Sequence, residues 1–141
     1  MSITTQIMVG SLLLGLCSII HIVILAYAIK FLTNLDKAFR SQGSTAHWIV
    51  FAAAGFGIVV FAHTVQVWTW AIAFVALDAL PQISNAIYFA LVTYTTLGYG
   101  DVTLDAGFRV FAAMAAVTGL LNFGLSTAFL VALVSRLLPR F

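Results

Sequence analysis

The sequence predicts an all-α membrane protein, and three observations lead to this fold class. Of its 141 residues, 63% are hydrophobic and only 7% are charged, whereas about one quarter of a soluble domain is charged. Three long apolar stretches could each cross a hydrocarbon core of about 30 Å as a helix. Two prolines, ten glycines and one cysteine exclude a collagen-like chain, a disordered segment and a disulfide-stabilised domain. We expect a multi-pass protein that contacts the lipid bilayer and binds no nucleic acid.

The first apolar stretch, residues 6–32, predicts a transmembrane helix in an N-terminal unit of residues 1–34. No Lys or Arg precedes its apolar core, and that core is longer than the core of a signal peptide. The helix is not a voltage sensor, because Lys30 near one end is its only basic residue.

The segment after this helix, residues 35–47, orients the chain. It carries Lys37 and Arg40, and the C-terminal residues add Arg136 and Arg140. Basic residues mark the cytoplasmic side of a membrane. We therefore expect a cytoplasmic loop over residues 35–47, an outside N-terminus and a cytoplasmic C-terminus, in a cell membrane such as a bacterial inner membrane.

The second apolar stretch predicts a helix over residues 48–77. Trp48 and Trp68 are twenty residues apart, which is about 30 Å along a helix, so they would lie in opposite aromatic belts of the bilayer. The third stretch, residues 107–138, predicts another transmembrane helix. We expect Asp105 to cap it and to form an ion pair with Arg109.

Between these two helices, an apolar run over residues 83–96 is too short to cross the bilayer. Its 14 residues would make a helix of about 20 Å, so it is re-entrant or lies on the surface. Pro81 suits the first turn of such a helix. The run leads into the sequence Thr95-Thr96-Leu97-Gly98-Tyr99-Gly100-Asp101. Two glycines in alternate positions allow backbone conformations closed to other residues, and carbonyls turned to one side could replace the hydration shell of a cation.

This motif resembles the filter of the potassium channel superfamily, which reads Thr-Val-Gly-Tyr-Gly-Asp. The match runs from Thr96 to Asp101, and Leu97 is the one departure. The resemblance extends over about residues 48–138, and residues 1–34 would be an additional N-terminal helix. It implies an outer helix over residues 48–77, a re-entrant pore helix over 82–95, a filter loop over 96–101 and an inner helix over 105–138.

The resemblance also implies what the protein does. It would be a potassium-selective channel that conducts K⁺ passively. Such a channel is not an enzyme and needs no cofactor. One chain would supply one quarter of each ring of oxygens, so four chains would assemble around a four-fold axis as a homotetramer.

Individual roles follow from the same resemblance. Residues of the filter would bind K⁺, mainly through backbone carbonyls: Thr96, Leu97, Gly98, Tyr99 and Gly100. Residues beside and behind the filter would support it: Asp101, Thr95, Tyr88, Phe89 and Val92. Residues of the inner helix would line the cavity and the gate: Gly119, Leu120, Phe123, Thr127 and Val131. Gly119 would be a hinge or a point of close helix packing, and Tyr88 could donate a hydrogen bond to Asp101.

Two histidines lie outside the filter motif but near the middle of antiparallel helices. His21 and His63 should lie at matching depth, with Gln66 on the same face as His63. They are either a hydrogen-bonded cluster that joins helices or a pH-sensitive element. Two other functions remain open: a weakly selective cation channel of the same fold, and a haem-binding electron carrier with the two histidines as axial ligands. One subunit of a potassium transporter would need several filter-like loops, and the sequence has one.

Overall fold

The computed structural model describes residues 1–39 and 45–135, and these are almost entirely helical. Three long helices are α1 (Ile3–Phe39), α2 (Thr45–Ala76) and α4 (Arg109–Ser135). A short helix, α3 (Ile83–Tyr94), lies between α2 and α4 in the sequence. The described residues contain no β-strand, so the expected all-α class is confirmed.

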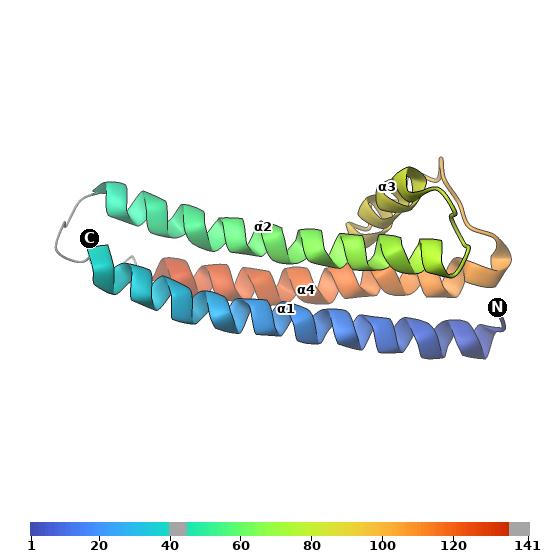
Figure 1. Cartoon of the computed structure of the whole chain (residues 1–141), viewed down its shortest axis with the longest axis horizontal. Coiled ribbons are helices and arrows are strands. Elements are labelled where there is room, and N and C mark those ends of the chain that lie inside the picture. The colour runs from blue at the N-terminus through green and yellow to red at the C-terminus, as the bar shows by residue number, and fades with distance from the viewer. Residues whose placement is uncertain (40–44, 136–141) are drawn as a thin grey trace.

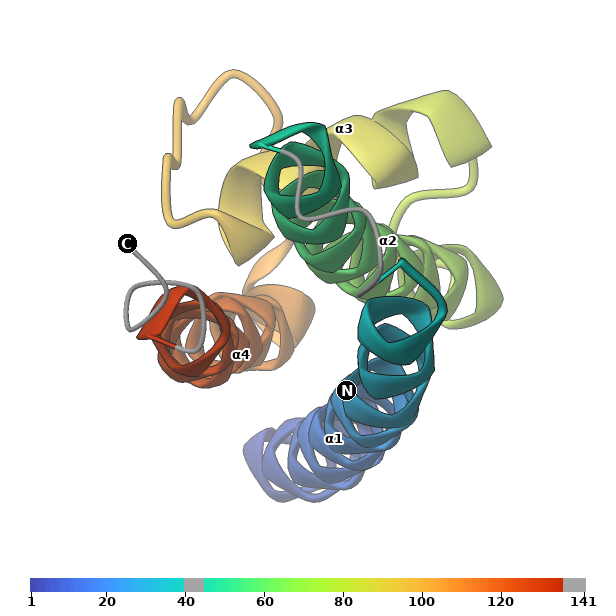
Figure 2. The same ribbon diagram turned by 90° about the vertical axis from the view of Figure 1, so that its left-hand side faces the viewer.

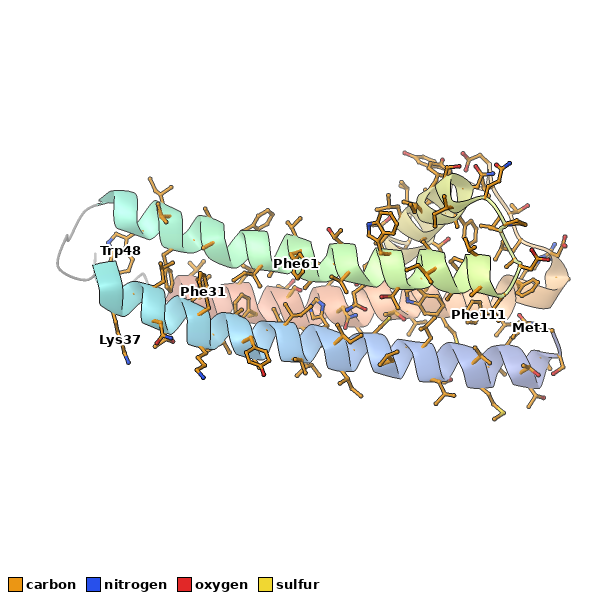
Figure 3. The ribbon with its side chains drawn as sticks, in the orientation of Figure 1. Met1, Phe31, Lys37, Trp48, Phe61 and Phe111 are labelled. Carbon is orange, nitrogen blue, oxygen red and sulfur yellow. The ribbon has the colours of Figure 1, made fainter. Side chains whose placement is uncertain are left out.

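The long helices lie side by side, and α3 sits at one end of them (Figure 1). Each is long and apolar enough to cross a membrane, whereas α3, at 12 residues, is not. Seen along the bundle, α1 and α3 lie on opposite sides of α2 (Figure 2). The N-terminus lies at the same end as α3, and Figure 3 places Lys37 and Trp48 at the other end. This agrees with the expected antiparallel arrangement, in which the N-terminus and the filter share one side.

Both helices that flank the expected loop are longer than predicted. Residues 35–39 belong to α1 and residues 45–47 to α2; residues 40–44, including Arg40, lie outside the described residues. Hydropathy marks only the part of a helix that is embedded in lipid, while the backbone hydrogen bonds continue into the interface. Lys37 in the last turn of α1 favours this extension, because it complements the negative end of the helix dipole.

The inner helix also begins differently from the prediction. A 3-10 turn, η2 (Ala106–Phe108), precedes α4, and residues 136–138 of the expected helix, with Arg136 and Arg140, lie outside the described residues. Asp105 occupies the N-cap position of η2 but makes no side-chain capping bond. Arg109 donates from Nε to the carbonyl of Leu104, at 3.5 Å. The predicted side-chain cap and ion pair of Asp105 were therefore wrong, because the 3-10 turn changes the spacing on which an i, i+4 pair depends.

The core lies at the end of the bundle where α3 packs against α2 and α4. Trp70 and Phe74 of α2 and Phe111 of α4 are completely buried there, and Figure 3 shows Phe111 between the helices. The rings of Phe74 and Phe111 meet edge to face at 5.6 Å, and Phe89 of α3 meets Phe74 in the same way at 5.1 Å. These aromatic contacts fix α3 against α2 and α4.

Candidate functional site

The C-terminal end of α3 folds the following loop back onto the helix. The N–H of Thr95 donates to the carbonyl of Leu91 at 3.1 Å, and the N–H of Thr96 donates to that of Thr93 at 2.9 Å. The carbonyl of Val92 then accepts two bonds, from the N–H groups of Leu97 at 2.9 Å and Gly98 at 3.2 Å. Three of the four carbonyls in the last turn of α3 are thereby paired, and the loop that begins at Thr96 is tied to α3 through its backbone.

The same two hydrogen bonds set the direction of the loop carbonyls. In a planar trans peptide the C=O points opposite to the N–H, and the described chain contains no cis peptide. Because the N–H groups of Leu97 and Gly98 point at α3, the carbonyls of Thr96 and Leu97 point away from it. The loop therefore presents consecutive oxygens on the side opposite to its supporting helix.

The backbone angles of the loop alternate in sign. Thr96, Gly98 and Gly100 have φ values of 60°, 58° and 78°, whereas Leu97 and Tyr99 between them are not among the residues of positive φ. Alternating handedness turns successive N–H groups to one side of the backbone, and the carbonyls of the same trans peptides therefore point to the other side. Glycine adopts positive φ freely, but Thr96 is β-branched and is strained there. The structure thus holds a costly conformation at the first residue of the motif.

Side chains of α3 lie behind and beside this loop. Phe89 and Val92 are buried, whereas Leu97 and Tyr99 are 56% and 68% exposed. The hydroxyl of Tyr88 donates to a carboxylate oxygen of Asp101 at 2.5 Å, so the predicted bond between them forms. The second carboxylate oxygen accepts the N–H of Val102 at 3.1 Å. These bonds close the motif onto α3 at its far end.

A close backbone contact joins α3 to α4. A Cβ atom added to Gly119 would lie 1.9 Å from the carbonyl oxygen of Tyr94 and 2.9 Å from its carbonyl carbon. Both contacts are to backbone, which cannot swing aside as a flexible side chain could. α4 continues unbroken through this glycine, so its observed role is close packing against the end of α3.

A family model described as "Ion channel" matches residues 60–136, which is more than half of the chain. The chain belongs to this family of ion channels. No curated protein and no solved structure matches it. The matched region holds the C-terminal half of α2, all of α3, the loop and α4, whereas α1 precedes it. Because three helices among residues 1–39 and 45–135 are able to cross a membrane, the channel is a multi-pass membrane protein.

The other predicted residues of the channel's inner helix differ in what they contact. Leu120 and Val131 are about 60% exposed in the single chain. Thr127 donates its hydroxyl to the carbonyl of Phe123 at 2.8 Å, within α4. The ring of Phe123 stacks on His63 of α2, with centroids 4.3 Å apart. Phe123 therefore packs partly against α2, and the assignment of these residues to a cavity and a gate stays a prediction.

The two histidines come together as expected, with ring centroids 5.0 Å apart. Ser126 of α4 lies between them and bonds Nε2 of His21 at 2.9 Å and Nε2 of His63 at 3.0 Å. Gln66 is not part of this contact, because its amide nitrogen donates to the carbonyl of Cys17 at 3.0 Å. The cluster does join helices, and its pH sensitivity stays a prediction.

This arrangement disfavours haem between the histidines. Axial ligands lie on opposite faces of a porphyrin, whereas here both Nε2 atoms bond one hydroxyl, that of Ser126. A macrocycle between the two rings would have to displace Ser126 and separate α1 from α2.

Sequence reasoning missed Ser126 and Tyr94 as partners of the histidines. Nδ1 of His63 bonds the hydroxyl of Tyr94 at 3.0 Å. One signal was available, because Asn122 and Ser126 stand four residues apart in an apolar helix and must share a buried face. Both are buried. The partner of that face could not be read from the sequence, because it depends on how four helices pack.

The bond from Tyr88 also affects the charge of Asp101, at the end of the loop that lies farthest from Thr96 in sequence. The hydrogen bond from Tyr88 lowers the pKa of Asp101, so this carboxylate keeps its charge to more acidic pH. Replacing Tyr88 with Phe should raise that pKa toward its ordinary value. Acid inhibition of ion flux into liposomes, measured as a function of external pH, should then begin at higher pH than in the wild type. Tyr27→Phe, at an exposed position of α1, is the matched control, and equal pH profiles for all three proteins would contradict the role of Asp101.

Proposed function

We propose that the protein is a potassium-selective channel whose filter is the loop Thr96–Asp101. The proposal rests on one observation: the filter motif coincides with a backbone whose carbonyls are directed away from the supporting helix. The sequence Thr-Leu-Gly-Tyr-Gly-Asp has φ values of alternating sign and carbonyls of Thr96 and Leu97 directed away from α3. Rings of such carbonyls replace the hydration shell of K⁺ in potassium filters.

We further propose that four copies of the chain form the channel. Irregular backbone at membrane depth is tolerated only when protein buries it or when it lines a water-filled path. In the single chain the loop has one face against α3, while Leu97 and Tyr99 stay largely exposed. Further copies around a common axis would cover these side chains and enclose the carbonyl oxygens. One chain would supply one quarter of each ring, as a closed symmetric assembly requires.

Two electrostatic features support cation conduction. α3 ends at Tyr94, and the C-terminal end of a helix carries a partial negative charge. Four such ends would favour a cation at the inner side of the filter. Asp101 remains ionised at the other end of the motif, where four carboxylates would raise the local concentration of cations. The filter would bind and release K⁺ without a covalent step or a cofactor.

We propose an orientation with the N-terminus and the filter entrance outside a cell membrane and the C-terminus in the cytoplasm. Lys30 and Lys37 near the C-terminal end of α1 support it, because basic residues are retained on the cytoplasmic side. The N-terminus and α3 lie together at the opposite end of the bundle.

Flux measurements test this function. Purified protein in liposomes should carry K⁺ much faster than Na⁺, and Ba²⁺ should block the K⁺ flux. Equal K⁺ and Na⁺ fluxes would indicate the alternative, a weakly selective cation channel of the same fold. Absence of flux for both ions, in protein of the expected mass, would contradict a constitutively conducting channel.

Native mass measurement tests the assembly. A detergent-solubilised particle should contain four chains of 15.2 kDa each. A monomer or dimer that nevertheless conducts K⁺ would overturn the proposed four-fold filter.

A further inference from the structure

Polar side chains from all four α-helices form one continuous hydrogen-bonded chain inside the protein. It runs from His21 of α1 to Ser126 of α4, then to His63 of α2 and finally to Tyr94 of α3. Its three links measure 2.9, 3.0 and 3.0 Å. His21, Ser126 and Tyr94 are at most 3% exposed. We call these four residues the histidine chain.

The chemistry of the neutral side chains gives the histidine chain a preferred direction. Nδ1 of His21 is buried and has no partner among the described residues. If it carried the proton, a buried N–H would be left without an acceptor, which costs more than a lone pair without a donor. Nε2 of His21 therefore donates to Ser126, Ser126 donates to Nε2 of His63, and Nδ1 of His63 donates to Tyr94. Each donor in this series has one acceptor.

The last member of the histidine chain stands at the start of the filter loop. Tyr94 ends α3, and its carbonyl is the atom packed against Gly119. Thr96, the first residue of the filter motif, follows two positions later and has a strained φ of 60°. A small displacement of Tyr94 would therefore change the part of the loop where the backbone has least freedom.

We infer that α1, which lies outside the matched family region, is a working part of the pore and acts on the filter through the histidine chain. His21, Ser126 and His63 are positioning residues that hold Tyr94, and through it the first carbonyls of the filter. This inference rests on the proposed function, since the effect is expected in ion selectivity.

Other bonds already hold α1 in place, so the histidine chain is not needed to dock it. Oε1 of Gln6 accepts the N–H groups of Val110 and Phe111, at 3.0 and 3.3 Å, at one end of α4. Gln66 of α2 donates to the carbonyl of Cys17, as described above. Removal of one hydroxyl from the histidine chain should therefore leave the bundle assembled while loosening the hold of this chain on Tyr94.

The experiment compares the K⁺/Na⁺ permeability ratio of full-length variants in liposomes. His21→Leu removes the donor that α1 supplies, Ser126→Ala removes the central hydroxyl, and Tyr94→Phe removes the last acceptor. Because one neutral hydrogen bond corresponds to a factor of about five, each variant should lower the ratio by about fivefold. His21→Gln retains a side-chain N–H donor and should recover most of the wild-type ratio. Ser18→Ala is the matched control, because the buried hydroxyl of Ser18 has no partner among the described residues.

A double variant separates action through the histidine chain from general loosening of the bundle. Residues that act through one chain have non-additive effects, so His21→Leu combined with Tyr94→Phe should lower the ratio no further than either change alone. Thermal unfolding and native mass are measured for every variant. If His21→Leu fails to assemble, Ser126→Ala and Tyr94→Phe, which each lose one oxygen, decide the matter.

The outcomes distinguish this inference from the function on which it rests. A wild type that conducts K⁺ selectively, with variants of unchanged ratio, would overturn the inference and leave the proposed function standing. A wild type that conducts neither ion, or both equally, would overturn the proposed function itself. Lowered thermal stability with an unchanged ratio would assign the histidine chain a purely structural role and also contradict the inference.

Discussion

Replacement of Gly119 with alanine is expected to abolish selective K⁺ flux. The new methyl group would lie 1.9 Å from the carbonyl oxygen of Tyr94, so α3 and α4 would have to separate. Overpacking of this kind typically costs about 1–3 kcal/mol, and it would occur in every subunit. The separation would also move the carbonyl of Val92, which holds the N–H groups of Leu97 and Gly98. Liposome flux and native mass, measured together, would separate loss of the filter from loss of assembly.

A second glycine of the same helix provides the control. A Cβ atom at Gly124 would meet no atom within 4 Å, and alanine is preferred over glycine inside a helix by about 0.5–1 kcal/mol. Gly124→Ala should therefore conduct like the wild type. If Gly119→Ala conducted equally well, the position of α3 and of the filter loop could not depend on the close contact between α3 and α4.

Replacement of Gly98 with alanine is expected to remove the preference for K⁺ over Na⁺. Gly98 has a φ of 58°, a left-handed conformation that costs an L-residue about 1–2 kcal/mol. A side chain there would favour a negative φ, which would turn a peptide group and break the alternation between Thr96 and Gly100. The permeability ratio in liposomes should fall by tenfold or more, because a free-energy difference of about 1.4 kcal/mol corresponds to a factor of ten.

The control for Gly98 is a glycine of ordinary conformation. Gly57 of α2 has a negative φ and open space around it, so Gly57→Ala should keep the wild-type ratio. A Gly98→Ala channel that remained selective would show that the alternating backbone is not the source of selectivity.

Much of the fold could be predicted from hydropathy and length. Residues 83–96 were correctly expected to be too short to span, because the length of a helix follows directly from its residue number. At the loop between them, α1 and α2 extend beyond the predicted spans, since polar residues such as Lys37 continue a helix beyond the lipid without any change in its backbone. Asp105 was assigned a capping role that a 3-10 turn removes.

The candidate site also has parts that could be predicted from the sequence and parts that could not. The filter motif and the bond from Tyr88 to Asp101 lie within one short segment, and the resemblance to potassium channels implied both. The histidine chain joins residues 31 to 105 positions apart. Matching depth in two helices was enough to pair His21 with His63. Predicting that Ser126 lies between them would also require knowing how α4 is rotated about its axis. Asn122 and Ser126 mark a buried face of α4, but the side chains that meet this face depend on how the helices pack.

The central claim, that the loop Thr96–Asp101 selects K⁺, is tested most directly by a reversal potential. Purified protein in a planar bilayer would face equal concentrations of K⁺ on one side and Na⁺ on the other. A potassium-selective filter should give a reversal potential far from zero, with the polarity expected for K⁺ leaving its own side, and Gly98→Ala should lose that potential. A current that reverses close to zero in the wild type would contradict potassium selectivity.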